Sequence, residues 1–213
     1  MSRMPYQLSR PVETSALMPP PKIKCHHEEP YLITRLGRAL QQHLTILDPT
    51  GLRKRVIVCI GTDRSTGDSL GPIVGTRLID LGTPVTVYGT LTKPVHATNL
   101  QETLDEIYSC FDSPIVIAVD ACLGRSESVG SITLASGALK PGAGVNKELP
   151  QVGDIHFTGI VNVGGYMEYF VLQNTRLGLV WKMANVIAAS IHHGLLLTHA
   201  QQAAETGTTP GLQ

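Results

Sequence analysis

The chain has little charge and no excess of either sign. Its 17 basic residues balance 17 acidic residues in a total of 213, and the isoelectric point is about 7.1. Without a basic surplus, the chain as a whole has no electrostatic attraction for nucleic acid or for an anionic membrane surface. We therefore expect no nucleic acid among its partners.

Cysteines are few and long apolar runs are missing. The four cysteines have no C-x-x-C spacing, which favours reduced thiols over disulfides. No segment reaches the roughly 18 consecutive apolar residues of a membrane span. Residues 1–24 also lack the apolar stretch of a secretory signal. These absences predict a cytoplasmic protein with no membrane association.

Proline content and periodicity divide the chain into three parts. Residues 1–30 contain several prolines but no helical or strand periodicity, which predicts a flexible N-terminal arm. A chain of this length with 42% apolar residues suits one domain, which we expect over residues 31–199. The polar residues 200–213 are expected to form a disordered tail.

Within the predicted domain, β-branched apolar runs alternate with amphipathic stretches. The apolar runs predict strands over residues 55–61, 84–89, 114–119, 131–134 and 155–163. Apolar residues at helical spacing predict helices from residue 32 to the stop at Asp48 and Pro49, and over residues 70–81, 100–111 and 166–193. This alternation predicts a three-layer αβα fold of the α/β class, with helices on both faces of a mostly parallel sheet.

Polar side chains follow three consecutive strands of the predicted sheet. Asp68 comes after the first strand, His96 after the second and Asp120 directly after the third. Ligands collect at the carboxyl ends of such strands, so we expect these side chains to converge. Two neighbouring carboxylates cannot readily both ionise, and the pair can then act as general acid and general base when water adds to a carbonyl. The same pair could instead hold a divalent metal.

Structural roles compete with each candidate. Asp68 could cap the following helix, and the Asp120 carboxylate could be satisfied by backbone amides. A lone histidine such as His96 is more often packed or solvated than catalytic. Residues 67–70 also match the nucleophile block of GDSL esterases, but the chain lacks the Asp-x-x-His pair that would activate Ser69.

Three blocks, residues 59–72, 117–125 and 141–150, resemble those of the YyaC-type sporulation proteins. The likeness extends over about residues 31–193. The chain is more remotely similar to the germination protease of endospores. These resemblances imply the phosphorylase/hydrolase-like fold, which also includes the hydrogenase-maturation endopeptidases.

The germination protease carries catalytic aspartates at the positions that match Asp68 and Asp120, and it uses no serine, cysteine or zinc. The resemblance therefore implies an aspartate-dependent protease that needs no cofactor and no metal. In the hydrogenase-maturation relatives, two acids and a histidine bind nickel. His96 does not follow the second acid in the sequence as their histidine does, so the resemblance supports no metal site here.

The leading hypothesis is a sporulation-associated or germination-associated peptidase, a hydrolase of the mother cell or forespore that acts on a protein or peptide such as a small spore protein. Backbone amides near Gly124 and at Gly164 and Gly165 are expected to stabilise the oxyanion. The predicted site comprises catalytic Asp68 and Asp120 and substrate-binding His96, Arg125, Gly164 and Gly165. A non-catalytic module that binds spore proteins and a metal-dependent hydrolase stay open as alternatives, as does homo-oligomerisation.

Overall fold

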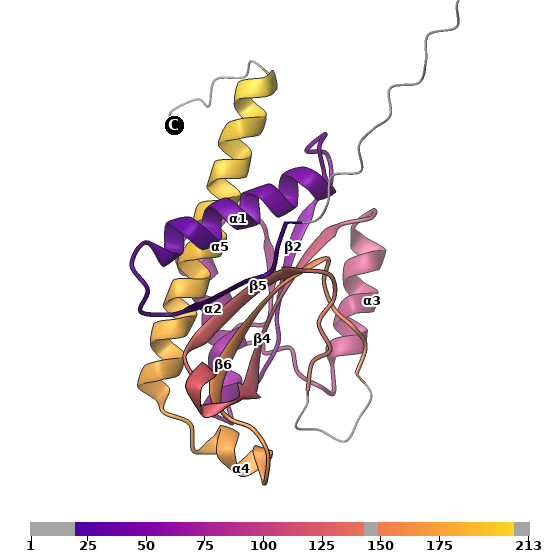
Figure 1. Cartoon of the computed structure of the whole chain (residues 1–213). Coiled ribbons are helices and arrows are strands. Elements are labelled where there is room, and N and C mark those ends of the chain that lie inside the picture. Colours follow the sequence, from indigo (N-terminus) through magenta and orange to yellow (C-terminus); the bar gives the residue numbers. More distant parts are fainter. Residues whose placement is uncertain (1–19, 143–148, 207–213) are drawn as a thin grey trace, which may run out of the picture.

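The sheet at the centre of the fold is mixed and mostly parallel (Figure 1). A computed structural model describes residues 20–142 and 149–206, and within these ranges six strands are ordered β1-β5-β6-β4-β2-β3. The strands are β1 Ile23–His26, β2 Arg55–Cys59, β3 Thr86–Tyr88, β4 Ile115–Gly124, β5 Ser131–Ser136 and β6 Ile155–Val163. Strands β3, β2, β4 and β6 run parallel, whereas β5 is antiparallel to both of its neighbours. The predicted fold class is confirmed.

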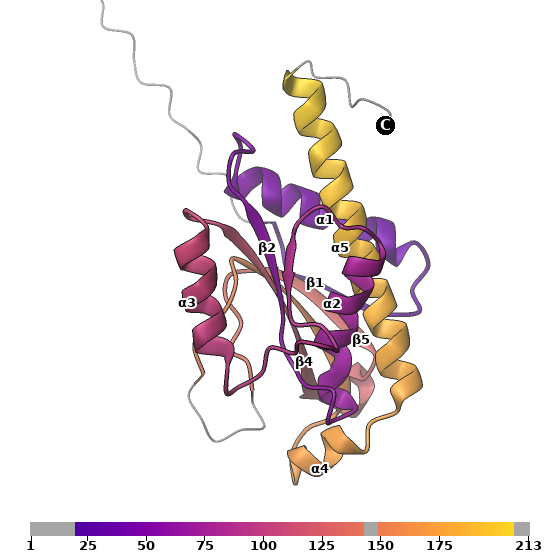
Figure 2. The ribbon, with the colours of Figure 1, turned by 180° about the vertical axis from the view of Figure 1, so that it is seen from behind.

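Helices cover both faces of this sheet (Figure 2). They are α1 Leu32–Leu47, α2 Leu70–Asp80, α3 Leu100–Cys110, α4 Glu168–Gln173 and α5 Leu177–Thr206, with single 3-10 turns η1 Gly67–Ser69 and η2 Ser126–Ser128. Successive side chains of a strand point to opposite faces. In β2, Ile57 and Cys59 accordingly pack with α1, α2 and α5, whereas Val56 and Val58 pack with α3. The sheet is the middle of three layers.

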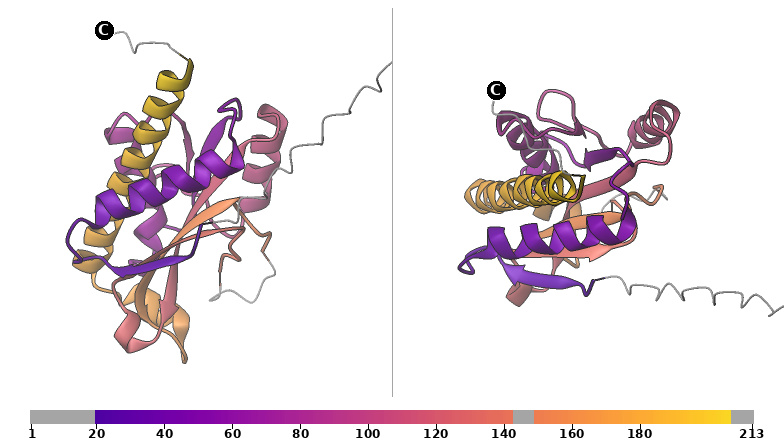
Figure 3. Two further views of the ribbon diagram at one scale, coloured as in Figure 1. Left: turned by 45° about the horizontal axis from the view of Figure 1, so that its top comes forward. Right: turned by 90° about the horizontal axis from the view of Figure 1, so that it is seen from above.

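The longest helix, α5, lies between α1 and α2 in the view from above (Figure 3). Its buried apolar side chains include Val180, Met183, Ile187 and Ile191. The hydroxyl of Ser190, which is also buried, donates to the carbonyl oxygen of Val186 one turn earlier. None of the helices in the described ranges has the length and continuous apolarity that a bilayer span demands.

Both ends of the folded part extend further than predicted. Residues 23–26, placed in the N-terminal arm by the sequence, form β1 and pair with β5, where Cys25 is buried. A strand of four residues is too short to show an alternating pattern in the sequence. Its pairing with β5 is what makes this segment a strand. Helix α5 continues through residues 200–206 of the predicted tail. The rest of the predicted arm and tail, residues 1–19 and 207–213, lies outside the described residues.

The prediction of one long helix over residues 166–193 is wrong, because the structure contains two helices there. Helix α4 ends at Gln173 and α5 begins at Leu177. The side-chain amide of Asn162 on β6 donates to the carbonyl oxygen of Val171 and to the hydroxyl of Thr175. These two hydrogen bonds hold the end of α4 and the following turn against the sheet, and a periodicity argument cannot anticipate them.

A close approach between α2 and β2 requires glycine at position 71. A Cβ atom on Gly71 would collide with the carbonyl oxygen of Ile60 at the end of β2. Backbone atoms cannot yield as a flexible side chain does, so any larger residue must push the start of α2 away from the sheet. Gly71 therefore sets how closely the loop that carries Asp68 lies against the strand ends.

We expect the substitution Gly71→Ala to lower the free energy of unfolding by about 1 to 3 kcal/mol, because overpacking forces backbone shifts. Urea denaturation followed by circular dichroism measures the change. The matched control is Gly178→Ala in the first turn of α5, where an added Cβ meets no atom within 4 Å. An equal loss in both variants would contradict the steric explanation.

Candidate functional site

Asp68 and Asp120 line the same pocket at the carboxyl ends of β2 and β4, together with His96. The pocket has a volume of about 210 Å³. Its other walls come from the segments after β2 and β3, from the last part of β4, from α4, and from residues near Pro141 and Leu149. The structure thus brings together the three side chains that the strand-end rule selected.

Asp68 is held by a loop that folds back between β2 and α2. The amide of Thr62 donates to the carbonyl oxygen of Asp68 at 3.1 Å. Gly61 has a φ of 146°, and a Cβ there would collide with that same carbonyl oxygen, so only glycine permits the contact. The N-cap of α2 is Ser69 and not Asp68, and Ser69 makes no side-chain capping hydrogen bond. Capping of α2 therefore does not explain an aspartate at position 68.

Asp120 sits inside β4 rather than directly after it. Strand β2 ends at Cys59, which pairs with Val119, while β6 continues and pairs Thr158 with Asp120. Asp120 is therefore the first residue of β4 beyond the end of β2, where the sheet opens into the pocket. Its Oδ1 accepts a hydrogen bond from the amide of Ala121 at 2.9 Å.

Burial and mutual repulsion make the two carboxyl groups hard to ionise together. Burial raises the pKa of Asp120 to about 8, with a further contribution from the negative charge of Asp68, while the amides of Ala121 and Gly142 oppose the increase. Burial also raises the pKa of Asp68, and the Ser65 hydroxyl opposes this in part. At neutral pH the pair therefore retains a proton on Asp120.

Cysteine and serine nucleophiles are not supported in this pocket. Burial, followed by the charge of Asp120, raises the pKa of Cys122 to about 11, so its sulfur stays a thiol at neutral pH. The buried Ser69 hydroxyl donates to the carbonyl oxygen of Thr66 at 2.7 Å and does not line the pocket. The four cysteines are unpaired in the described part of the chain, as their spacing predicted.

His96 lines the pocket from a turn before α3 that hydrogen bonds hold in place. Its amide donates to Oδ1 of Asn99 at 2.8 Å, and its Nδ1 lies 2.8 Å from the hydroxyl of Thr98. Within residues 20–142 and 149–206, no group of three or more His, Cys, Asp or Glu side chains is arranged to hold a metal ion. In these residues the metal-dependent alternative therefore lacks a set of three such ligands.

Three predicted site residues do not line the pocket. The Arg125 side chain is 88% exposed and pairs with Glu127 at 3.9 Å. The amide of Gly164 donates to the carbonyl oxygen of Gly124, and the amide of Gly165 donates to Oε1 of Glu168. Both amides therefore already have acceptors in this structure, and their role in stabilising an oxyanion stays a prediction.

Helix α4 supplies a wall of the pocket that the sequence analysis missed. Glu168, Tyr169 and Leu172 all line the pocket. The helical pattern over residues 166–193 does not show that the short helix with these three side chains is separate from α5. The left-handed conformation of Met167, with a φ of 52°, starts α4 at this point, and no sequence signal indicates it for a methionine.

Comparisons with known proteins found relatives that match most of the chain. The family described as "Protein of unknown function (DUF1256)" matches residues 24–190. "Uncharacterized protein YyaC" of Bacillus subtilis (strain 168) is 58% identical over 166 residues, which cover 75% of this chain and 78% of that protein. A similar solved structure is a [NiFe] hydrogenase maturation protease HycI from Thermococcus kodakarensis KOD1, with 18% identity, a TM-score of 0.43, and coverage of 68% of this chain and 98% of that chain.

Proposed function

The chain belongs to the DUF1256 family, as its YyaC-type resemblance predicted, and we propose that it is a peptidase in which Asp68 and Asp120 activate water. The observation that carries the proposal is the shared pocket of two carboxyl groups, one from the 3-10 turn η1 and one from β4, both with a raised pKa. A pair that keeps one proton at neutral pH contains an acid and a base side by side.

In the proposed reaction the Asp68 carboxylate takes a proton from water while the water oxygen bonds to the carbonyl carbon of the substrate. Asp120 donates its proton to the carbonyl oxygen as that oxygen gains charge. The tetrahedral intermediate then loses the amine: the C–N bond breaks, Asp68 returns its proton to the nitrogen, and a hydroxyl proton returns to Asp120. The pair finishes in its starting protonation state.

A polypeptide substrate suits the surface beside this pocket. Tyr166, Met167, Tyr169 and Phe170 are 87%, 56%, 64% and 57% exposed, although all four are large apolar or aromatic residues. Tyr169 also lines the acidic pocket, so an extended chain entering there would contact the exposed part of α4. Contiguous exposed apolar residues of this kind mark protein interaction sites.

The substrate class that we propose is small proteins of the spore core, cleaved in the mother cell or forespore. This part of the proposal follows from the resemblance to sporulation proteins and to the germination protease. The pocket and the α4 surface support a protein substrate but do not distinguish one protein from another.

The test is cleavage of a protein extract from sporulating Bacillus subtilis cells by the parent chain and by Asp68→Asn. We expect the parent to release products and the variant to be about a hundredfold or more slower, because asparagine cannot accept the proton of water. The matched control is Asp63→Asn in the same loop, whose exposed side chain does not line the pocket and whose loss leaves cleavage unchanged.

The same assay separates the alternatives. Loss of cleavage on addition of EDTA would support a metal-dependent hydrolase instead of a carboxylate pair. Binding of an extract protein that stays intact over a range of pH would support a non-catalytic binding module. Equal activity of Asp68→Asn and the parent would remove Asp68 from the mechanism.

A further inference from the structure

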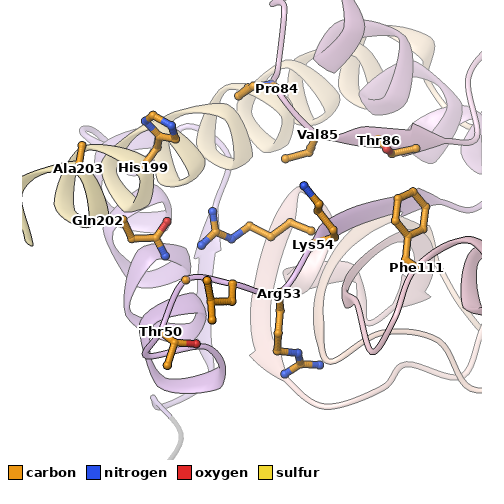
Figure 4. Close-up of a pocket in the computed structure, with 13 residues that line it drawn as sticks. Thr50, Arg53, Lys54, Pro84, Val85, Thr86, Phe111, His199, Gln202 and Ala203 are labelled. Atoms are coloured by element: carbon orange, nitrogen blue, oxygen red, sulfur yellow. The ribbon is translucent and has the colours of Figure 1, made fainter. Parts of the chain in front are cut away.

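A second pocket lies at the opposite end of the sheet, where β2 and β3 begin (Figure 4). Its volume is about 750 Å³, within the range of small-molecule sites. It is bounded by the loop before β2, the start of β3 and residues 199–203 near the end of α5. Within the described residues, it shares no lining side chain with the acidic pocket.

The lining of this second pocket is basic. Arg53, Lys54 and Arg55 follow one another along it, and among the described lining residues none is acidic. Arg53 has a structural task, because its three guanidinium nitrogens donate to the carbonyl oxygens of Ser113, Leu47 and Pro114. Lys54 is exposed and extends toward Pro84 and Val85 in Figure 4. Lys54 and Arg55 are thus the cations that a ligand would meet.

Arg55 carries donors that the described part of the chain leaves unused. Its Nε and Nη2 atoms are shielded from solvent and have no hydrogen-bond partner among the described residues. These two nitrogens lie on one edge of the guanidinium plane, where their N–H groups form the fork that binds two oxygens of one anionic group. A shielded guanidinium edge without an acceptor among the described residues is costly, and a ligand that supplies acceptors would remove this cost.

The carboxylate of Asp48 does not satisfy Arg55. The charge of Asp48 counteracts the effect of burial, which lowers the pKa of Arg55. However, the Asp48 oxygens accept hydrogen bonds from the amides of Leu52 and Arg53 and from the hydroxyl of Thr50. Asp48 therefore holds the loop before β2 together and leaves the Arg55 fork without an acceptor.

We propose that this pocket binds a small phosphate monoester, with the phosphate held by Arg55 and Lys54. A phosphate carries close to two negative charges and three terminal oxygens, so the Arg55 fork can take two oxygens while Lys54 takes the third. Because this edge is shielded in the structure, the Arg55 side chain has to turn to present it to the entering anion. The apolar side chains of Leu52, Val85 and Phe111 then face the organic part of the ligand.

The test is calorimetric titration of the full chain with inorganic phosphate, phenyl phosphate and malonate at pH 7 and constant ionic strength. We expect saturable binding of both phosphates, tighter for phenyl phosphate because of the apolar walls, and weaker or no binding of the dicarboxylate. Arg55→Lys keeps the charge but removes the fork, and should weaken phosphate binding about tenfold. Lys54→Ala should weaken it about fivefold.

The matched control is Lys93→Ala, which removes one positive charge from the loop after β3, at the other end of that strand from the pocket. It should leave the affinity for phosphate unchanged. Lys54 is exposed, so its variant is expected to fold even if Arg55→Lys does not, and circular dichroism checks both. Absence of phosphate binding, tighter binding of malonate, or an equal loss in Lys93→Ala would overturn the proposal.

Discussion

Replacing Asp120 by asparagine is expected to slow peptide cleavage about a thousandfold at pH 7, the middle of the range for loss of a general acid. Asparagine keeps the size of the side chain and can still accept the hydrogen bond from the amide of Ala121. It cannot release a proton to the carbonyl oxygen of the substrate. The rate of product formation from a cleaved spore protein, followed by mass spectrometry, measures the effect.

The Asp120→Asn variant needs a check that its fold is intact, since lost activity alone could reflect misfolding. Its near-ultraviolet and far-ultraviolet circular dichroism should match the parent, because a neutral side chain suits this buried position at least as well as a carboxylate. Cleavage by a folded Asp120→Asn variant at the parental rate would end the proposed mechanism.

Most of what the sequence could predict follows from the alternation of strands and helices along the chain. Strand β6 has the predicted bounds, and β2 has the buried β-branched run that the sequence indicated. Asp68 and Asp120 are 52 positions apart, and only the rule that parallel strands end at a common edge brought them together. The carboxyl pair could be predicted because topology brings the ends of β2 and β4 together, while Gly61 and Gly71 set how closely the loop with Asp68 approaches.

The missed features depend on contacts between distant segments. Asn162 holds the turn between α4 and α5 against the sheet. Glu168, Tyr169 and Leu172 of α4 line the acidic pocket, and periodicity does not show the turn that follows this helix. The amide of Gly164 donates to the carbonyl oxygen of Gly124, which only the folded chain brings close. The basic pocket likewise requires α5 to pass the start of β2, and the sequence gives no sign that the Arg55 fork lacks an acceptor.

The free energy of unfolding is expected to fall as the pH rises from 6.5 to 8, because of Asp120, by about 1.4 kcal/mol per pH unit at first and by about half of that near pH 8, so by roughly 1.5 kcal/mol in total. The folded-state pKa of Asp120 is about 8, whereas an aspartate in the unfolded chain titrates near 4. Between these values the folded chain holds a proton that the unfolded chain has released, so each rise in pH favours unfolding. This contribution is complete below about pH 4 and is lost as the pH passes 8. The raised pKa of Asp68 acts in the same direction.

Urea denaturation of the parent and of Asp120→Asn at half-unit steps of pH isolates this contribution. Burial lowers the pKa of His43 and of His27, which makes stability rise with pH below about 6.5, but both histidines are present in both proteins and their effect cancels in the difference. We expect the variant to have the flatter profile and to be the more stable protein at pH 8, while it is also the less active one. Parallel profiles would show that Asp120 ionises normally in the folded chain, and the acid of the proposed mechanism would then be missing. A stability gain that accompanies lost cleavage is the combined result expected of a carboxyl group kept buried for catalysis, because a group kept there for structure would lose stability when replaced.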